Sequence, residues 1–559
     1  MWKFTKKPPL PANDLSRIAK FFEQTFSKIA ERKYEYRESV LFLPLLFFIA
    51  GIRTSNFSFG ISIPVIFIIF LLLLQLAIHV FPKNINYYFN PFQNAIVLSV
   101  LSMWCGMIYA KCRCESGIFP PKYWQKSISL TLKADTIVIR DKRKGIFYGY
   151  GVISDISAVH QLKGERIFFA LERTNDIPIP FRGQKFKVQG RLKYVRENSD
   201  WWFFKHLKNM RVHWMLSDGC LLSWESKASP WQVFFRKTFD RFLHIITIGV
   251  EDKKIEYGIM SGMLTGYRQG IDKPSRVLFN GLGISHLFAV SGVHMGIFAA
   301  TIDFFLKVIC VSKRFRTILI LSLLTFYVNA IGCSPSSVRA LGMVVFYYVS
   351  SLLGRKPTVL SALTNSALFH VLYDPFVVFN ISFLLSYAVV AGIVLIGGPL
   401  EKFLSHIFLN LHGLKFESYS LIDRMLFRLK KLLITSFSIS LTAYFVSIPI
   451  SIDYFGSMSL LTIPANMFIV PLATVAIVVG AVTLFFGLWK IWMLCSVLNN
   501  ISCRLIYFFR LLAHGIYNDS CYLRNITIPY IGGTSLTMLI LVGAYIIFSI
   551  KNSVNYQLE

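Results

Sequence analysis

The sequence predicts a polytopic α-helical membrane protein of about 11 to 12 spans, with an extracytoplasmic all-β, OB-like domain inserted between its helices. Three observations predict this fold class. The chain has 559 residues, 54% of them hydrophobic, and a mean hydropathy of +0.53. Stretches such as 59–81 and 535–550 carry almost no charge, and a bilayer core needs about 20 such residues in a helix. Between about 124 and 223 the pattern changes to the alternation typical of strands.

Three segments divide the chain. Residues 1–115 hold a basic N-terminus and three apolar spans, at about 39–52, 59–81 and 94–110. Residues 116–226 form the β domain. Residues 227–559 begin with charged amphipathic helices between 230 and 276, which we expect to lie along the membrane interface or to cap the helix bundle. About nine spans follow, at 284–309, 316–332, 337–353, 361–374, 377–397, 432–455, 460–487, 491–514 and 532–550.

The β domain is predicted to contain about five short strands, such as "SISLTLKADTIVIRD" and "GQKFKVQGRL". They are rich in Ile, Val, Phe and Tyr, and Gly, Asp and Asn turns separate them. Five strands in about 100 residues favour a small barrel of the OB type. An unrelated β-sandwich is the alternative.

Lys and Arg residues predict the orientation, because they accumulate in cytoplasmic loops. The basic N-terminus, which contains no visible signal peptide, is placed in the cytoplasm. Three spans then put the β domain outside, and further alternation puts the basic segments 312–316, 354–356 and 428–431 inside. We therefore expect a multi-pass protein of the bacterial cytoplasmic (inner) membrane.

The formal net charge is +30, which has two interpretations. Part of it is ordinary orientation charge in cytoplasmic loops. The rest lies in the polar segment between about 111 and 254, which is too long for its charge to act through topology alone. A polyanionic partner is therefore plausible.

The segment "GISHLFAVSGVHMG", residues 283–296, combines an apolar setting with two histidines, two serines and three glycines. On one helix His286 and His294 would lie roughly 12 Å apart along the axis, too far to share a metal ion. Together with Ser285 and Ser291 they favour an interior face or a kinked, partly unwound helix that lines a polar path. The alternative is close helix packing around small residues.

Three further segments place polar residues within apolar surroundings. In 331–341, Arg339 is either a cation that snorkels to the interface or a fixed charge at a pore mouth. In 367–387, we expect Asp374 to cap a helix or pair with an Arg, and Asn380 to be structural. In 454–475, Asn466 lies between two prolines, which predict a broken helix beside a cavity or a simple packing kink.

Catalytic motifs are missing from the sequence. It contains no G-x-S-x-G, H-E-x-x-H, H-x-H-x-D or Walker pattern. Its nine cysteines do not include two closely spaced pairs of the kind that bind a zinc ion. We expect no metal, no cofactor and no enzymatic activity. An intramembrane hydrolase that uses Ser291 and His294 is kept as an alternative.

Several segments resemble those of ComEC-type competence proteins. "GLGISHLFAVSGVHMGIF" is similar to the family's most specific motif, and "GCSPSSVRALGM" to its P-S-x-x-R-A block. "LYDPFVVFNISFLLSYAVVAGI" and "SIPISIDYFGSMSLLTIPANMFIVPL" resemble its two later blocks, and "FRGQKFKVQGRL" resembles a strand pair of its N-terminal β domain. The resemblance extends from about residue 40 to 530. Leu384 stands where the family usually has Gln, and the family's N-P-G-x-F-D segment near 198–202 is lost.

The resemblance implies an inner-membrane channel that passes single-stranded DNA into the cytoplasm during natural transformation. It also implies a cytoplasmic ATP-driven DNA translocase and a periplasmic or surface DNA receptor as partners. The candidates for path lining are Ser285, His286, Ser291, His294, Arg339, Asp374, Asn380 and Asn466. The candidates for DNA binding on the β domain are Lys185, Lys187, Arg191, Lys193, Trp201, Trp202 and Lys205.

Many family members end in a β-lactamase-like domain with metal ligands. The expectation here is that no such domain follows the last span, so that any nuclease would be a separate protein. Rival functions are a channel or assembly factor for another polyanion, such as an envelope polysaccharide, the intramembrane hydrolase, and a structural membrane scaffold.

Overall fold

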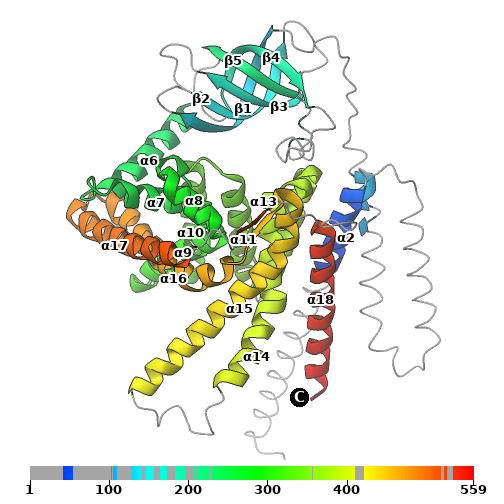
Figure 1. Cartoon of the computed structure of the whole chain (residues 1–559), viewed down its shortest axis with the longest axis vertical. Helices are drawn as coiled ribbons and strands as arrows, with labels where there is room; N and C mark the ends of the chain where they lie inside the picture. The colour runs from blue at the N-terminus through cyan, green and yellow to red at the C-terminus, as the bar shows by residue number, and fades with distance from the viewer. Residues whose placement is uncertain are drawn as a thin grey trace, which may run out of the picture.

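A computed structural model describes the chain in parts (Figure 1). The described residues of the N-terminal part are 42–54 and 102–109 without 104. In the β domain they are 127–225, without 142–145, 157–163, 173–182, 196–206, 208–211 and 213. In the remainder they are 229–558, without 356, 410–420, 518–521 and 525–532. The predicted span at 59–81 lies outside them, and the span at 94–110 is described only in part.

Five strands form a closed barrel in the order β1-β2-β3-β5-β4. Their bounds are β1 Ser127–Asp141, β2 Ile146–Ile156, β3 Arg166–Glu172, β4 Lys185–Tyr194 and β5 Trp214–Trp224. β4 pairs with β1 and with β5 in antiparallel fashion, and β3 pairs with β5 in parallel. The prediction of a small barrel is confirmed, and the sandwich alternative is wrong.

Alternation along the strands explains the barrel, because successive side chains point to opposite faces. In β4, Phe186, Val188 and Leu192 are buried, while Lys185 and Lys187 are exposed. The inward side chains of all five strands form one apolar core.

Three helices follow the barrel: α6 Pro230–Thr247, α7 Lys254–Thr265 and α8 Lys273–Gly281. α6 is amphipathic and buries Phe242, Ile245 and Ile246 against its neighbours. Every residue of α7 from 258 to 265 is buried. α7 is therefore part of the helix core, and the expectation that this segment lies along the membrane interface or caps the bundle stays a prediction.

The remaining helices include four stretches that are long and apolar enough to cross a membrane: Ile381–Leu409, Ile422–Phe455, Thr462–Leu488 and Trp492–Ile516. Three shorter apolar helices accompany them among the described residues. This content fits a polytopic, mostly helical membrane protein, and the count of 11 to 12 spans stays a prediction. The helices are α2 Phe42–Thr54, α9 Gly292–Val308, α10 Lys313–Ala330, α11 Pro335–Leu352, α12 Val359–Tyr373, α13 Ile381–Gly392, α14 Gly398–Leu409, α15 Leu421–Phe455, α16 Thr462–Leu488, α17 Trp492–Ile516 and α18 Gly533–Leu558.

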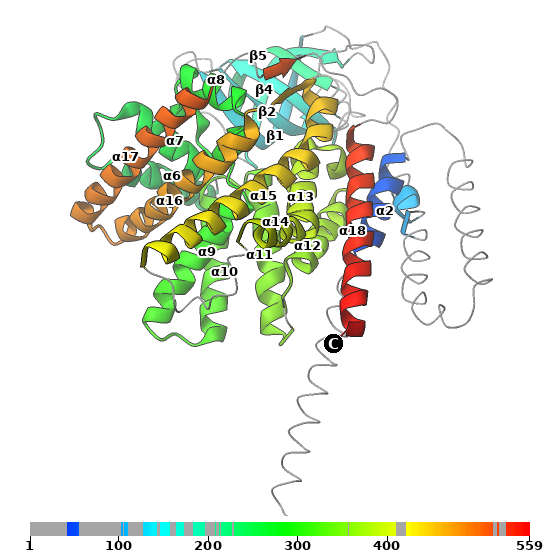
Figure 2. The same ribbon diagram turned by 60° about the horizontal axis from the view of Figure 1, so that its bottom comes forward.

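The helices pack around two apolar cores. One is built mainly from α6 to α11 with α16 and α17. In Figure 2, α15, α16 and α17 run side by side in this order. The other joins α2, α12, α13 and α18. The polar segments singled out in the sequence lie between these helices.

Candidate functional site

The segment 283–296 is not one continuous helix. α8 ends at Gly281, a 3₁₀ turn, η4, covers Ser285–Phe288, and α9 begins only at Gly292. Gly283 has φ +70°, and a Cβ there would collide with Thr462 at the start of α16. The expected span 284–309 is therefore wrong at its start. The separation of about 12 Å assumed both histidines on one helix, and His286 and His294 do not share one. The interpretation of this segment as partly unwound is confirmed.

Ser291 and His294 form the start of α9. The Ser291 backbone N–H donates to Nδ1 of His294 at 3.2 Å, and Oγ of Ser291 lies 2.8 Å from the same nitrogen. Since Nδ1 accepts the backbone hydrogen bond, the proton of a neutral ring is on Nε2. That nitrogen is buried and has no hydrogen-bond partner among the described residues. An unpaired buried donor costs about 1–3 kcal/mol.

His286 lies in a different environment from His294. His286 is exposed, whereas His294 is 2% exposed. Ser285 donates from Oγ to Oδ1 of Asn280. Nε of Arg268, in the short turn η3 Arg268–Gly270, donates to the carbonyl of Phe288 at 3.1 Å. The two histidines thus differ in solvent exposure, although they lie within electrostatic range of each other.

Arg339 is 2% exposed. Its Nη2 donates to the Ser382 carbonyl at 2.8 Å and to the Ser382 hydroxyl at 2.6 Å. It forms no ion pair with any acidic residue that the structure describes. The enclosed guanidinium does not match an interfacial snorkelling cation, because it links α11 to the first turn of α13. The role of a fixed charge at a pore mouth stays a prediction.

Two of the remaining candidates are helix caps. Oδ1 of Asp374 accepts from the Phe376 N–H at 2.9 Å and caps the turn η5 Pro375–Phe379. Oδ1 of Asn380 accepts from the Ser382 N–H at 2.9 Å and caps α13. The expectations of a cap at Asp374 and of a structural Asn380 are confirmed.

Asn466 lies on α16 with its side-chain oxygen buried and without a hydrogen-bond partner among the described residues. α16 is continuous from Thr462 to Leu488 and contains Pro471 in its interior. The prediction that prolines break this helix is therefore wrong. Pro464 falls in the first turn, where its missing N–H costs nothing.

The four polar segments meet at one end of the helix bundle, which we name the motif end and define as residues 283–291, 331–339, 374–382 and 454–462. Gly283 touches Thr462, Tyr454 donates to the Phe379 carbonyl at 2.9 Å, and Arg339 bonds Ser382. Segments separated by up to about 180 positions are thus in contact at this end of the bundle.

A polar network behind the motif end was missed by the sequence analysis. Ser366 Oγ lies 2.9 Å from the Tyr387 hydroxyl, and His370 Nδ1 donates to the Ser366 carbonyl at 2.7 Å. A Cβ on Gly342 would lie 2.7 Å from Ser366 Oγ, so α11 approaches α12 closely at this point. Gly342 was a signal in the sequence for close packing, but not for its partner.

On the barrel, the predicted cations of β4 point away from the core. Lys185, Lys187 and Arg191 are exposed, and Lys193 is half-buried with its Nζ 3.6 Å from Oδ2 of Asp218. Lys133 of β1 is exposed and pairs directly with Lys185. Like charges opposite each other destabilise a sheet, so this face accumulates positive charge at a cost. Trp201, Trp202 and Lys205 lie outside the described residues.

A second barrel face is aromatic and was also missed. Tyr148 and Tyr150 of β2 pack with Phe168 of β3, and the Arg166 guanidinium lies 5.2 Å from the Tyr150 ring centre. Burial raises the pKa of the Tyr150 hydroxyl, although the charge of Arg166 opposes the shift. Val195, Leu207 and Val212 cover part of this face. Tyr148 is within electrostatic range of Arg268, and Figure 1 shows β2 on the side of the barrel nearer the helices.

A protein-family model described as "Competence protein" matches residues 263–552, which is more than half of the chain and includes the whole motif end. The chain belongs to the competence protein family. The resemblance noted in the sequence is thereby confirmed for this region. The β-barrel of this competence protein precedes the matched residues.

One curated relative is "ComE operon protein 3" of Bacillus subtilis (strain 168), which is 28% identical over 225 residues. The alignment covers 40% of this competence protein and 26% of the relative, so it spans about a quarter of that protein's length. No solved structure matches the chain.

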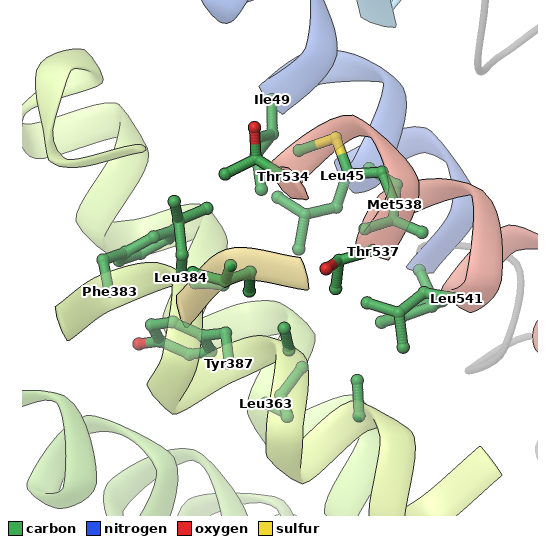
Figure 3. Close-up of a pocket in the computed structure, with 16 residues that line it drawn as sticks. Leu45, Ile49, Leu363, Phe383, Leu384, Tyr387, Thr534, Thr537, Met538 and Leu541 are labelled. Carbon is green, nitrogen blue, oxygen red and sulfur yellow. The ribbon is translucent and has the colours of Figure 1, made fainter. Parts of the chain in front are cut away.

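The competence protein also contains an apolar pocket of about 50 Å³ between α2, α12, α13, α15 and α18 (Figure 3). Leu384 lines it, together with Phe383, Tyr387 and Leu541. The hydroxyl of Thr537 on its wall already donates to the Gly533 carbonyl at 3.0 Å.

Among the described residues, no group of three His, Cys, Asp or Glu side chains could hold a metal ion.

Proposed function

We propose that this competence protein is an inner-membrane channel that carries single-stranded DNA into the cytoplasm during natural transformation. The observation that carries the proposal is the motif end: four polar segments of the family region gather on one surface. A polar surface at the end of an apolar helix bundle is what the entrance of a water-filled path requires. The wider role in DNA uptake rests on the family and on the named relative.

The barrel is proposed to be an OB-like domain that receives the strand. Its five strands close in an order in which β4 lies between β5 and β1, as in a Greek-key barrel of this size. Single-strand binders combine cations for the phosphates with aromatic rings for the bases. The β4 face supplies the cations Lys185, Lys187 and Arg191, and the β2–β3 face supplies Tyr148 and Tyr150.

The proposed orientation follows from where the basic segments lie. Residues 312–316 form the start of α10, directly after the turn that follows α9, and Arg355 follows α11, so both lie at the helix ends opposite the motif end. Residues 428–431 lie in the N-terminal third of α15, whose other end, near Tyr454, belongs to the motif end. The positive-inside rule then puts this basic end in the cytoplasm and the motif end outside.

The proposal includes partners but no catalysis by this chain. The sequence contains no Walker pattern, so the work of pulling DNA is assigned to a cytoplasmic ATP-driven translocase. A receptor outside the membrane would deliver the duplex, and degradation of the second strand is assigned to a separate nuclease.

The decisive experiment measures transformation frequency with naked linear DNA in an in-frame deletion strain. We expect loss of transformation, with electroporation of the same DNA unaffected because that route bypasses the channel. Unchanged transformation in a strain whose parent is competent would refute the proposal. Tighter binding of a nonnucleic polyanion than of single-stranded DNA by the full chain in nanodiscs would favour the polysaccharide alternative.

The contact between Ser291 Oγ and His294 Nδ1 at 2.8 Å favours a second candidate, an intramembrane hydrolase. Two variants separate this candidate from a structural cap. Ser291→Asn keeps a side chain that caps a helix but removes the nucleophilic hydroxyl, and Ser291→Thr keeps both. Loss of transformation with Asn and retention with Thr would support hydrolysis, whereas retention with both would exclude it.

A further inference from the structure

The helices α13–α14 and α15 are longer than a membrane requires. The stretch Ile381–Leu409 has 29 residues, and Ile422–Phe455 has 34. At a 1.5 Å rise these measure about 43 and 51 Å, whereas a hydrocarbon core is about 30 Å thick and is crossed by about 20 residues. The surplus is therefore about 9 residues on the first stretch and about 14 on the second.

Both surpluses lie at the same end. Ile381 begins at the motif end, and α15 returns there at Phe455. Counted from the motif end, the surplus residues are 401–409 and 422–435. Glu401 and Thr435 stand at these two boundaries, and the Thr435 hydroxyl donates to Oε1 of Glu401 at 3.0 Å. The two helices thus leave the span at one common level, which this polar pair marks.

We name residues 401–409 and 422–435 the surplus hairpin. No residue of the described helix α14 is buried, and none of residues 422–437 on α15 is buried. Figure 1 shows the lower ends of α14 and α15 on the side of the bundle far from the barrel. Within the described part of the chain, few residues therefore pack against this end of α14 and α15.

The surplus hairpin is amphipathic. On α15, Ile422, Met425, Leu426 and Leu429 are 70%, 71%, 50% and 52% exposed and follow the i, i+3, i+4, i+7 spacing of one helix face. Phe403 and Ile407 are 61% and 52% exposed on α14. The cations on the opposite face of α15 are Arg424, Arg428 and Lys431, and the hairpin also contains Lys402 and Lys430.

Five cations against the two acids Glu401 and Asp423 give the surplus hairpin a formal charge of +3. We propose that the surplus hairpin lies in the membrane interface and binds the headgroups of anionic phospholipids. Its position directly after two spans puts it at the headgroup level. Exposed apolar side chains suit the acyl boundary there, and each Lys or Arg near an anionic surface contributes about 1 kcal/mol.

The test uses the full chain in detergent, titrated with phosphatidylglycerol or phosphatidylcholine, with bound lipid counted by native mass spectrometry. The triple variant Arg428→Gln, Lys430→Gln, Lys431→Gln should raise the apparent dissociation constant for phosphatidylglycerol about tenfold or more. The value for phosphatidylcholine should not change. The matched control Lys133→Gln, Lys187→Gln, Arg191→Gln removes the same net charge from the barrel and should leave both values unchanged.

An equal loss in both triple variants would overturn the proposal, because net charge alone would then explain the binding. Lack of preference of the parent for phosphatidylglycerol would overturn it as well. So would a hairpin variant that loses transformation while its lipid preference is intact, since that result would indicate a protein partner. Met425→Ser with Leu429→Ser serves as a second variant: it keeps the charges and should weaken the binding of both lipids several-fold.

Discussion

The cations of β4 and the cation at Arg339 show two opposite uses of positive charge in one molecule. Lys187 and Arg191 stand on the outside of the barrel, exposed, between inward apolar residues. Arg339 is enclosed and donates hydrogen bonds to the carbonyl and the hydroxyl of Ser382 on a neighbouring helix. An exposed cation is available to a phosphate, whereas an enclosed one organises the protein around itself. Residue type alone does not distinguish the two roles, and burial does.

The largest expected effect is at Arg339. Arg339→Ala removes both hydrogen bonds that link α11 to α13, and the loss of a hydrogen bond from a charged group costs about 1.5–3 kcal/mol. We expect a lower unfolding temperature of the purified protein and loss of transformation by orders of magnitude. Ser382→Ala is the matched control, because it removes the hydroxyl but keeps the carbonyl bond, and its effect should be clearly smaller. Equal effects would show that the carbonyl bond is unimportant.

His294 tests whether the motif end needs more than a helix cap. His294→Ala should abolish transformation while the amount of membrane protein stays normal. His294→Gln places at the third helical position a side chain that can reach back to the Ser291 N–H, as in a capping box, but it lacks the imidazole. Recovery of transformation with Gln would reduce His294 to a cap, and normal transformation with Ala would remove it from the site.

The role of the exposed cations of β4 is tested by the salt dependence of DNA binding. Lys187→Gln with Arg191→Gln should reduce the slope of log affinity against log salt by about 1.4 for a single strand, which corresponds to two phosphate contacts. The unfolding temperature should stay within error of the parent. Lys193→Gln is a graded control, since Lys193 already faces Asp218 and should change the slope less. An unchanged slope in the double variant would remove β4 from the DNA site.

The smallest effect concerns Tyr150. Burial raises its pKa in the folded barrel, so unfolding releases a phenol that ionises more readily, near pH 10. Its contribution to stability is therefore complete below the unfolded pKa and is lost as pH rises toward the folded one. Tyr150→Phe should make the free energy of unfolding fall less steeply above pH 10. An identical pH profile would show that the hydroxyl is hydrated.

Local patterns in the sequence were sufficient for the elements. Alternation in "KFKVQGRLKY" predicted β4 with its cations outward. Uninterrupted apolar runs predicted α16 and α17 within a few residues, whereas α15 begins at Leu421, well before the predicted start at 432. The cap at Asp374 was also predicted, and its side-chain oxygen accepts from an N–H two residues away. Asn380 was expected only to be structural, and its role as a cap came from the structure. The glycines and serines of 283–296 predicted an unwound segment, because small and polar residues favour breaks over long helices.

Contacts between segments far apart in the sequence could not be predicted, because the local sequence around a residue does not show which distant residue it will contact. The sequence determined that this is a basic, helical membrane protein with a small β domain and the motifs of the competence family. Only the tertiary structure decided that Arg339 is enclosed rather than open, that His286 and His294 face different surroundings, and that Tyr148 and Tyr150 share a face with Phe168. Burial depends on what the rest of the chain places on top of a residue, and that is fixed only when helices and strands far apart in the sequence pack together.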